Sequence, residues 1–513
     1  MLYLVHQFLE RSARDFPRSQ ALVYGRERLS YEQVWDGARA VSRALMGQGL
    51  QKGDRIAVYL EKSPQEIMSL YGASLAGGVF VILHPSLTHT QAAYVLRQSG
   101  ARYLLTDPSK AGLLENSFKS LRALSKVLVW RKYRLSGAWQ RKALKSAASK
   151  AGSDVLNGHD LATIIYTSGS TGQPKGVMLT HQNVTLSAHA STEYLENRPG
   201  DILMGTLPMS FDYGLVQLMS AFKFGGSLIL KSFLSGEDLM STAFREKVNG
   251  LGGIPTMLIP ASESRILQNR KFRHLRYITN SGGRLPVSCF RRLQKLLPRT
   301  QIYSMYGFTE AFRASYLDPA RLHARPDSIG KAIPNARLYV LDEKGRECRA
   351  GQIGELVQAG PLVSRGYWRD PDETAKKIRQ NPLHDHYADP VCYSGDWVKK
   401  DREGYLYFVG RKDQMIKSSG FRISPDEIES VLCRHRGVQS AAAVGIADEV
   451  LGQRIKVSLV MKKGFLRKEE EIRRHCQKYL PAYMQPHGIQ FLGKMPLTAH
   501  GKIHRGLLAG RKA

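Results

Sequence analysis

Residues 163–176 read TIIYTSGSTGQPKG. Thr163 and the apolar residues after it predict a buried strand that runs directly into the loop 167–176. The loop contains three glycines, four hydroxyl side chains and one lysine. The glycines let backbone N–H groups converge, and the hydroxyls and the ammonium add donors for phosphate oxygens. We therefore interpret the segment as a phosphate-binding loop. It is not a Walker A loop, because Pro174 stands where the second glycine belongs and Gly176 follows the lysine.

Short apolar segments alternate with longer amphipathic ones along the chain. We expect strands at 55–60, 77–83 and 101–106, with helices at 64–75 and 88–99 between them. This succession favours a parallel sheet with crossover helices, and the same alternation returns from 202 to 297. From about residue 338 the segments become rich in strands, which predicts a β-layer that closes a large domain.

A second, smaller unit begins near Asp413. We expect helices at 425–433 and 468–479 there, with strands at 440–445 and 455–462. The predicted fold class is α/β. A large N-terminal domain (1–410) has parallel-rich sheets with flanking helices plus a β-layer, and a small α+β C-terminal domain spans 414–513.

The length and composition fit a folded, multidomain protein. The chain has 513 residues, of which 42% are hydrophobic and 23% charged. No apolar run is long enough to span a bilayer, and the first residues lack a signal-peptide cleavage site. The five cysteines are scattered and form no CxxC pair, so neither a disulfide framework nor a zinc site is indicated. These features predict a cytoplasmic protein without a transmembrane segment.

The net charge of +31 favours anionic partners, although it would also suit a generally basic proteome. Residues 126–150 form the densest basic stretch and carry no acidic side chain. Trp130, Tyr133 and Trp139 interleave it, which would suit the stacking of nucleic-acid bases. We favour a solvated surface excursion instead and expect no nucleic-acid partner.

Six motifs in a fixed order resemble the adenylate-forming superfamily. This superfamily of AMP-dependent synthetases and ligases includes acyl-CoA synthetases, peptide-synthetase adenylation domains and beetle luciferases. Besides the loop, the motifs are YGASLAGGVFVILHP (71–85), SGGRLP (281–286), YGFTE (306–310), SGDWVKKDREGYLYFVGR (394–411), SGFRISPDEIE (419–429) and PLTAHGKIHR (496–505). The resemblance covers nearly the whole chain. It implies a ligase that uses ATP and Mg²⁺ to convert a carboxylic acid into an acyl-adenylate, and then transfers the acyl group to a thiol.

The resemblance assigns the catalytic roles residue by residue. The Thr309 hydroxyl contacts the α-phosphate, and Glu310 holds Mg²⁺ as an oxygen ligand. Lys502 reaches from the small domain to bridge the substrate carboxylate and the α-phosphate. Negative charge grows on phosphate oxygens during this reaction, so positioned cations and donors supply most of the catalysis.

The nucleotide-binding residues follow from the same motifs. The Tyr306 ring stacks on adenine, and the Asp396 carboxylate accepts both ribose hydroxyls. Two positions depart from the common pattern, with Ser304 in place of Asn and Arg284 in place of Glu. The remaining expected ATP contacts are Thr167, Ser168, Gly169, Ser170, Thr171, Gly172, Lys175, Gly282, Gly283 and Arg411.

The resemblance also implies that the small domain moves. Residues 411–413 correspond to a hinge, centred on Asp413, about which that domain swings between adenylation and thioester formation. Gly420 lines the tunnel for the thiol in the second state.

The acid-binding pocket has a polar character. The family pocket corresponds here to Asp212, Val216, Ser281, Met305 and Arg313, together with Thr279. Asp212 occupies the place where peptide-synthetase adenylation domains bind the amino group of their substrate. A second reading is that Asp212 and Arg313 pair with each other. The set suits an amino or otherwise polar acid better than a long alkyl chain.

The acceptor of the acyl group is left open by the sequence. Residues 211–222 and 306–317 look most like the acyl-CoA ligase subgroup associated with exosortase loci. No carrier domain is visible after the last motif, so we expect either CoA or the phosphopantetheine of a separate acidic carrier protein. A CoA ligase is favoured over a stand-alone amino-acid adenylation enzyme. A luciferase-type oxidative enzyme and a non-catalytic nucleotide or nucleic-acid binder are the other classes considered.

Overall fold

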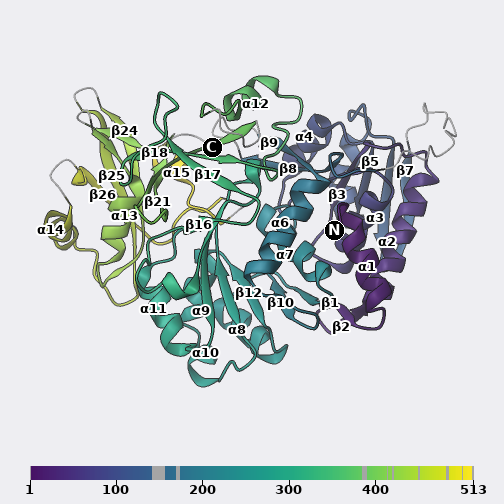
Figure 1. The fold of residues 1–513 in the computed structure, drawn as a ribbon, viewed down its shortest axis with the longest axis horizontal. Coiled ribbons are helices and arrows are strands. Elements are labelled where there is room, and N and C mark those ends of the chain that lie inside the picture. The colour runs from purple at the N-terminus through teal and green to yellow at the C-terminus, as the bar shows by residue number, and fades with distance from the viewer. Residues whose placement is uncertain are drawn as a thin grey trace.

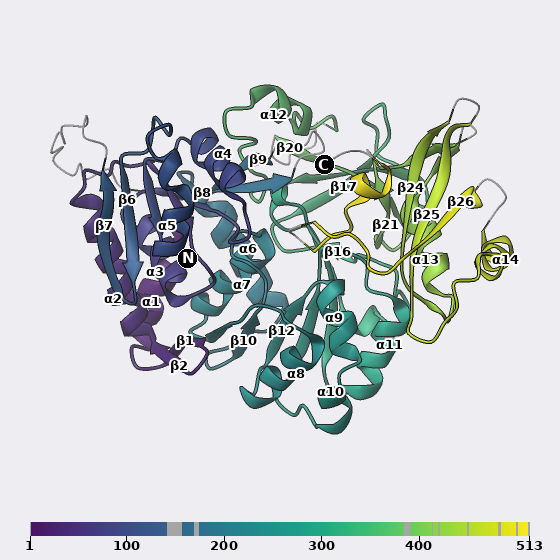
Figure 2. The same ribbon diagram turned by 180° about the vertical axis from the view of Figure 1, so that it is seen from behind.

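A computed structural model describes residues 2–140, 156–168, 174–383, 390–412, 414–418, 421–448, 451–480, 484–498 and 501–510. The described strands form four sheets. In Figures 1 and 2 the seven-stranded sheet lies at one end of the molecule and the C-terminal strands lie at the other, with the nine-stranded sheet below and between them.

The seven-stranded sheet has the order β7-β6-β5-β3-β4-β8-β9. Its strands are β3 (Arg55–Tyr59), β4 (Val79–Ile82), β5 (Tyr103–Thr106), β6 (Lys126–Arg131), β7 (Arg134–Gln140), β8 (Leu161–Ser168) and β9 (Pro174–Thr180). Its helices are α2 (Tyr31–Met46), α3 (Pro64–Leu75), α4 (His89–Ser99) and α5 (Pro108–Leu114). Strand β3 pairs in parallel with both β4 and β5, which confirms the predicted crossover arrangement.

The predicted element ends differ by one or two residues where local chemistry sets the boundary. The Thr88 hydroxyl accepts a hydrogen bond from the Gln91 N–H, so Thr88 caps α4 and does not belong to it. Gly77 has a φ of +83°, which turns the chain before β4 can begin.

The nine-stranded sheet has the order β16-β15-β14-β13-β12-β10-β11-β1-β2. Its strands are β1 (Gln20–Tyr24), β2 (Glu27–Ser30), β10 (Ile202–Gly205), β11 (Ser227–Leu230), β12 (Gly250–Gly253), β13 (Tyr277–Asn280), β14 (Gln301–Tyr306), β15 (Ser315–Leu317) and β16 (Lys331–Ala332). The strands from β1 to β14 along this order pair in parallel. The alternation predicted for 202–297 is therefore confirmed.

The helices α1 (Val5–Asp15), α6 (His181–Tyr194) and α7 (Asp212–Lys223) lie in the middle of the molecule (Figure 1). The Tyr71 ring of α3 stacks on Phe222 of α7 with centroids 5.4 Å apart, and both side chains are buried. One core thus joins the helices of the two large sheets. The helices α8 (Gly236–Arg245), α9 (Pro255–Ser262), α10 (Arg265–Asn269) and α11 (Val287–Leu296) pack with the nine-stranded sheet around a second core.

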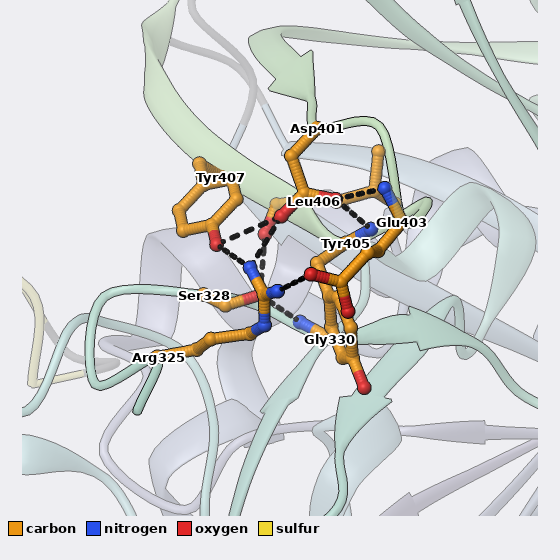
Figure 3. Close-up of polar contacts among 8 residues, drawn as sticks. All are labelled: Arg325, Ser328, Gly330, Asp401, Glu403, Tyr405, Leu406 and Tyr407. Carbon is orange, nitrogen blue, oxygen red and sulfur yellow. Dashed lines mark hydrogen bonds and ion pairs between the residues drawn. The ribbon is translucent and has the colours of Figure 1, made fainter. Parts of the chain in front are cut away.

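The predicted β-layer is present as an antiparallel sheet. It contains β17 (Arg337–Leu341), β18 (Ile353–Ala359), β19 (Ile378–Arg379), β20 (Val391–Lys400) and β21 (Leu406–Arg411), with α12 (Pro371–Lys377) between β18 and β19. Figure 3 shows how the turn between β20 and β21 is fastened to the segment before β16. There Arg325 pairs with Asp401 at 2.5 Å and also with Glu403, and the Ser328 hydroxyl donates to the Leu406 carbonyl at 2.8 Å. This contact fixes β20 and β21 against the nine-stranded sheet.

The C-terminal unit has its own sheet and its own core. Its elements are β22 (Ile416–Ser418), β23 (Phe421–Ile423), α13 (Pro425–Cys433), β24 (Val438–Asp448), β25 (Gly452–Met461), α14 (Glu469–Tyr479), β26 (Gly488–Leu492) and α15 (Arg505–Leu508). The four elements expected in this unit are present, although β24 extends beyond the predicted 440–445 at both ends because it pairs along its length with β25. The molecule is thus a large α/β N-terminal domain with a small C-terminal domain.

The basic stretch after residue 126 is an edge hairpin. Strands β6 and β7 pair antiparallel, and Trp130 is buried with its indole N–H donating to the Ser69 hydroxyl at 2.9 Å. Trp130 is therefore a packing residue, and the alternative reading in which it stacks on bases is wrong. The Trp139 side chain and residues 141–150 lie outside the described residues.

All five cysteines are free thiols. Within the described part of the chain, no helix has the length and apolarity needed to cross a bilayer.

Candidate active site

The motif residues converge at the carboxyl ends of the parallel strands of the nine-stranded sheet, where α/β folds place their ligands. Tyr306 ends β14, and its hydroxyl donates a hydrogen bond to Asp396 Oδ2 from β20. The Asp396 side chain is 5% exposed, and Arg411 Nε at the end of β21 lies 3.2 Å from Asp396 Oδ1. Burial raises the pKa of Asp396, whereas Arg411 and the Tyr306 hydroxyl lower it.

Asp396 Oδ1 accepts no hydrogen bond from the described residues in spite of the nearby guanidinium. A buried carboxylate oxygen without a donor is costly, so this atom is available to a donor from a ligand. A vicinal diol supplies such donors, which fits the expected ribose.

A hydrogen bond joins a second pair of motif residues, Asp212 and Thr309. Asp212 begins α7, and the Thr309 hydroxyl, in a short 3₁₀ turn after β14, donates to Asp212 Oδ2 at 3.4 Å. Burial raises the pKa of Asp212, and the charges of Arg313 and Lys502 lower it. The carboxylate therefore lies within the electrostatic reach of both cations.

The structure also bears on the expected pairing of Asp212 with Arg313. No ion pair within 4.0 Å joins these two described residues. The Arg313 guanidinium instead lies over the Tyr213 ring, 4.6 Å from its centroid, and the side chain is buried. The two charges balance each other at a distance without direct contact.

Glu310 is the expected magnesium ligand. Its Oε1 accepts a hydrogen bond from the Tyr367 hydroxyl, and its backbone carbonyl accepts one from the Ser364 N–H at 2.8 Å. Among the described residues, no cluster of three or more metal-ligating side chains occurs. A single carboxylate fits a Mg²⁺ ion that arrives with the phosphates of ATP, because this ion is commonly held by one or two carboxylates plus phosphate oxygens.

The C-terminal loop that carries Lys502 rests on the large domain. A Cβ placed on Gly501 would lie 3.2 Å from Ile254 Cδ1 and 3.5 Å from Thr256 Oγ1. Gly501 has a φ of +71°, a conformation that favours glycine, and the Thr498 N–H donates to the Lys502 carbonyl at 2.7 Å. This turn holds Lys502 where its charge lowers the pKa of both Asp212 and Asp396.

The glycine pair lies across from this loop. A Cβ on Gly282 would come 3.2 Å from Ile254 Cγ2, and one on Gly283 would come 3.2 Å from Pro255 Cγ. Gly282 has a φ of +74°. Both glycines are exposed, so a flat base has access to their backbone, as expected for the adenine position.

The predicted phosphate-binding loop connects two paired strands. Thr167 and Ser168 end β8, whose partner β9 begins at Pro174, and Gly169, Ser170, Thr171 and Gly172 lie outside the described residues. The Lys175 ammonium lies 2.6 Å from Glu373 Oε2 of α12. Lys175 and Lys376 lower the pKa of Glu373 to about 2. The expected phosphate ligand Lys175 thus has a protein carboxylate as its partner in this structure.

A cavity extends inward from these residues between α6, α7 and the ends of β12, β13 and β14. Its volume is about 20 Å³, and it continues into space that is open to solvent. Four of the expected pocket residues line it: Val216, Thr279, Met305 and Arg313. Ser281 is buried but does not line the cavity, and Asp212 lies one helical turn before Val216.

Several residues of the site have no counterpart in the sequence prediction. Tyr367 binds Glu310 and Glu373 binds Lys175, both across long separations in sequence that no local pattern reveals. Ser220 lines the cavity and follows Asp212 and Val216 at helical spacing, so the 3.6-residue period of α7 is a signal that would have identified it. The predicted hinge residue Asp413 and tunnel residue Gly420 lie outside the described residues.

The amino-acid sequence matches two known protein families, one over each part of the chain. The family description "AMP-binding enzyme" matches residues 9–368, and "AMP-binding enzyme C-terminal domain" matches residues 427–502. The chain belongs to the AMP-binding enzyme family. The predicted resemblance to the adenylate-forming superfamily is thereby confirmed, and so is its fold.

The relatives of this AMP-binding enzyme activate different acids. It is 28% identical to a long-chain-fatty-acid–CoA ligase of Bacillus subtilis, over 98% of this chain and 93% of that protein. It is 30% identical to an L-proline–[L-prolyl-carrier protein] ligase of Streptomyces coelicolor, over 93% and 91%. It is also 30% identical to a linear gramicidin synthase polypeptide of Brevibacillus parabrevis, over 98% of this chain, but spans only 6% of that much longer protein.

Solved structures of relatives contain nucleotide. ATP-bound MatB from Rhodopseudomonas palustris superposes on this AMP-binding enzyme with a TM-score of 0.87 and 26% identity, over 99% of both chains. An o-succinylbenzoate coenzyme A synthetase from Bacillus subtilis, in complex with ATP and a magnesium ion, shares the fold with a TM-score of 0.84 and 24% identity, over 98% of both chains.

Proposed function

We propose that this AMP-binding enzyme activates a carboxylic acid with ATP to an acyl-adenylate and then transfers the acyl group to a thiol, with CoA as the favoured acceptor. The position of Lys502 carries the proposal. Its loop rests on Ile254 and Thr256 of the large domain, and from there its charge lowers the pKa of the buried Asp212 and Asp396.

In the first half-reaction, a carboxylate oxygen of the substrate attacks the α-phosphorus of ATP. The bond from that phosphorus to the bridging oxygen breaks, and pyrophosphate leaves with the electron pair. Lys502 and Thr309 stabilise the charge that develops on the α-phosphate and on the attacking carboxylate. No side chain needs to exchange a proton in this step.

The other motif residues bind and orient the nucleotide. Asp396, with one oxygen free of hydrogen bonds from the described residues, accepts from the ribose hydroxyls. Gly282 and Gly283 admit adenine beside their backbone, and Tyr306 lies at the same end of the neighbouring parallel strand β14. Glu310 would hold the Mg²⁺ that accompanies ATP, where the ion neutralises phosphate charge.

In the second half-reaction, the sulfur of the acceptor attacks the acyl carbonyl, and AMP leaves. Our proposal places the hinge at Asp413, with residues 1–410 and 414–513 as the two moving parts and Gly420 in the thiol tunnel. The change from the β20–β21 sheet to the sheet of β22 between Arg411 and Ile416 is consistent with this boundary.

A stand-alone amino-acid adenylation enzyme that loads a separate carrier protein is the second candidate. The buried Asp212, one helical turn before the cavity residue Val216, favours it, because an ammonium group would satisfy that carboxylate. The prolyl-carrier ligase among the relatives shows that this family includes such activities. The assignment to the exosortase-associated subgroup is also part of the proposal and rests on the segments 211–222 and 306–317 alone.

The exchange of labelled pyrophosphate into ATP tests the proposal. Purified protein with Mg·ATP should catalyse this exchange only when a suitable acid is present. Offering CoA or a phosphopantetheinylated carrier protein next, and detecting the thioester by mass spectrometry, separates the two acceptors. Absence of acid-dependent exchange across a broad panel of amino, hydroxy and fatty acids would contradict the proposed activity.

A further inference from the structure

The cavity behind Asp212 contains an unusual number of buried polar atoms without partners. Five of its lining side chains each present one such atom, and none of these atoms has a hydrogen bond from a described residue. They are Ser191 Oγ, Asn197 Oδ1, Gln217 Oε1, Ser220 Oγ and Arg313 Nε. Buried polar groups in folded proteins are normally satisfied, so a group of five in one cavity indicates a ligand with its own polar atoms.

The two amide side chains are oriented by their neighbours. Gln217 Nε2 donates to the Met204 carbonyl at 3.4 Å, so its oxygen is directed away from that carbonyl. Asn197 Nδ2 donates to the Tyr277 hydroxyl at 2.9 Å and to Asp201 Oδ2 at 3.4 Å. Both amide oxygens are therefore acceptors that need donors, and rotating either amide would bring two acceptors together.

Arg313, in contrast, is a donor that needs an acceptor. Its buried guanidinium forms no ion pair within 4.0 Å with the described residues, and its Nε–H needs an acceptor. Its charge is balanced by that of Asp212, whose pKa it lowers. A second carboxylate on the substrate would bring a further negative charge close to Asp212 and to two amide oxygens that already lack donors.

Glycine makes the space for Gln217. A Cβ on Gly252 of β12 would lie 2.1 Å from Gln217 Nε2 and 3.0 Å from the Tyr213 hydroxyl. The amide thus occupies room that only a missing side chain provides. The cavity is small, about 20 Å³, so it suits the small polar end group of a short acid.

We propose that this cavity binds the tail of a short carboxylic acid whose tail is uncharged and both donates and accepts hydrogen bonds, as a carboxamide does. The carboxamide oxygen accepts from Arg313, and its NH₂ group donates to Gln217 and Asn197. The inference rests on the proposed adenylation activity and specifies its substrate class. A straight-chain fatty acid would leave all five polar atoms unsatisfied.

Three acids of the same shape test which end group the cavity prefers. Glutaramate carries the carboxamide, glutarate carries a second carboxylate, and 5-methylhexanoate has an apolar branched end. The corresponding α-amino acids are glutamine, glutamate and 2-amino-5-methylhexanoate. One of the two sets, the plain acids or the α-amino acids, will support faster exchange. Within that set, kcat/KM for pyrophosphate exchange should be at least about tenfold higher for the carboxamide than for either other acid. A preference for the apolar acid or for the dicarboxylate would overturn the proposal.

A variant of a cavity residue tests whether the preference for the carboxamide arises in the cavity. Gln217→Met removes the acceptor oxygen at nearly constant length, and should abolish the tenfold preference while retaining exchange with the apolar acid. Gln490→Met, at an exposed position of β26, is the matched control and should retain the preference. If Gln217→Met does not fold, Ser220→Ala removes one hydroxyl only and should reduce the preference in the same direction. An unchanged preference in the folded variant contradicts the proposal.

Binding provides a readout that does not need turnover. In the presence of ATP, the carboxamide acid should raise the melting temperature more than its two analogues. If 5-methylhexanoate gave the highest kcat/KM for exchange, this inference would be contradicted but the proposed function would be supported. Absence of exchange with every acid would instead contradict the proposed function, and the order of the melting shifts would still decide the tail preference.

Discussion

At the scale of single residues, Asp396 is the side chain whose surroundings most directly indicate a ligand. It is buried, it accepts from Tyr306, and its second oxygen is free of hydrogen bonds from the described residues. Asp396→Asn preserves the shape but replaces an ionised acceptor by a neutral amide. We expect KM for ATP to rise about 10–100-fold, the range expected when a hydrogen bond to a charged group is lost.

Steady-state kinetics at saturating acid measures this effect. Asp372→Asn, at an exposed position of α12, is the control for the loss of one carboxylate. Wild-type KM for ATP in the Asp396 variant would argue against its role at the ribose.

At Lys175, the ligand expected from the sequence motif differs from the contact in the structure. The motif assigns it to a phosphate, but its ammonium lies 2.6 Å from Glu373 Oε2. We infer that ATP must compete with Glu373 for this cation. Glu373→Gln removes the competing charge, so KM for ATP should fall several-fold, and the effect should shrink at high salt because both charges are partly exposed.

The same variant, Glu373→Gln, also tests whether Lys175 has only a structural role. If Lys175 serves only to fasten β9 to α12, Glu373→Gln should leave KM for ATP unchanged and lower the melting temperature instead. Measuring both quantities on one preparation distinguishes the two roles.

At the scale of elements, the strands and helices that the sequence pattern predicted by residue range are present, and most of their ends agree within two residues. The reason is that buried parallel strands such as β3 and β5 are short apolar runs between amphipathic helices, and this alternation is visible locally. Boundaries were missed where a cap or a glycine turn decides them, as at Thr88 and Gly77.

The site was predictable only where a motif carried it. Tyr306, Thr309, Asp396 and Lys502 were proposed as site residues because the strings that contain them resemble the motifs of a family. The contact of Tyr367 with Glu310, and the polar lining by Asn197 and Gln217, depend on which strand ends face each other. Such long-range placement is not encoded in any local period.

The packing of α1 against α6 makes stability depend on pH. His6 and His181 are buried with ring centroids 6.3 Å apart, and burial lowers their pKa values to about 4 and about 3. Because both folded pKa values lie below the unfolded value of about 6.5, the folded state favours the neutral rings. Their contribution is fully present above pH 6.5 and is lost as the pH falls toward 4.

At pH 5, each histidine should therefore lower the free energy of unfolding by about 2 kcal/mol relative to pH 7. In the double variant His6→Asn, His181→Asn, neither side chain titrates. The amide at 181 can accept from the Val5 N–H as Nδ1 of His181 does, and the amide at 6 can bond to the Ser74 hydroxyl in either direction. Urea unfolding at the two pH values should show a smaller difference for the variant than for the wild type. Equal differences would show that these histidines do not control the pH dependence.

At the scale of the whole molecule, the loop that carries Lys502 joins the C-terminal unit to the large domain. The C-terminal unit folds around its own apolar core, and its loop tip at Gly501 touches Ile254 and Thr256 of the large domain. The Arg325 contacts in Figure 3 fix the opposite wall of the site, which carries Asp396 and Arg411. The site is therefore completed only when the small domain lies against the large one.

We propose that Lys502, delivered by the small domain, drives adenylation but not thioester formation. The most direct measurement compares Lys502→Ala with wild type in the two half-reactions, with Lys494→Ala, at an exposed position of the same domain, as the control. We predict that acid-dependent pyrophosphate exchange falls at least about 10²–10³-fold, while transfer from preformed acyl-adenylate to the thiol stays near the wild-type rate. Exchange at the wild-type rate in Lys502→Ala would contradict the account.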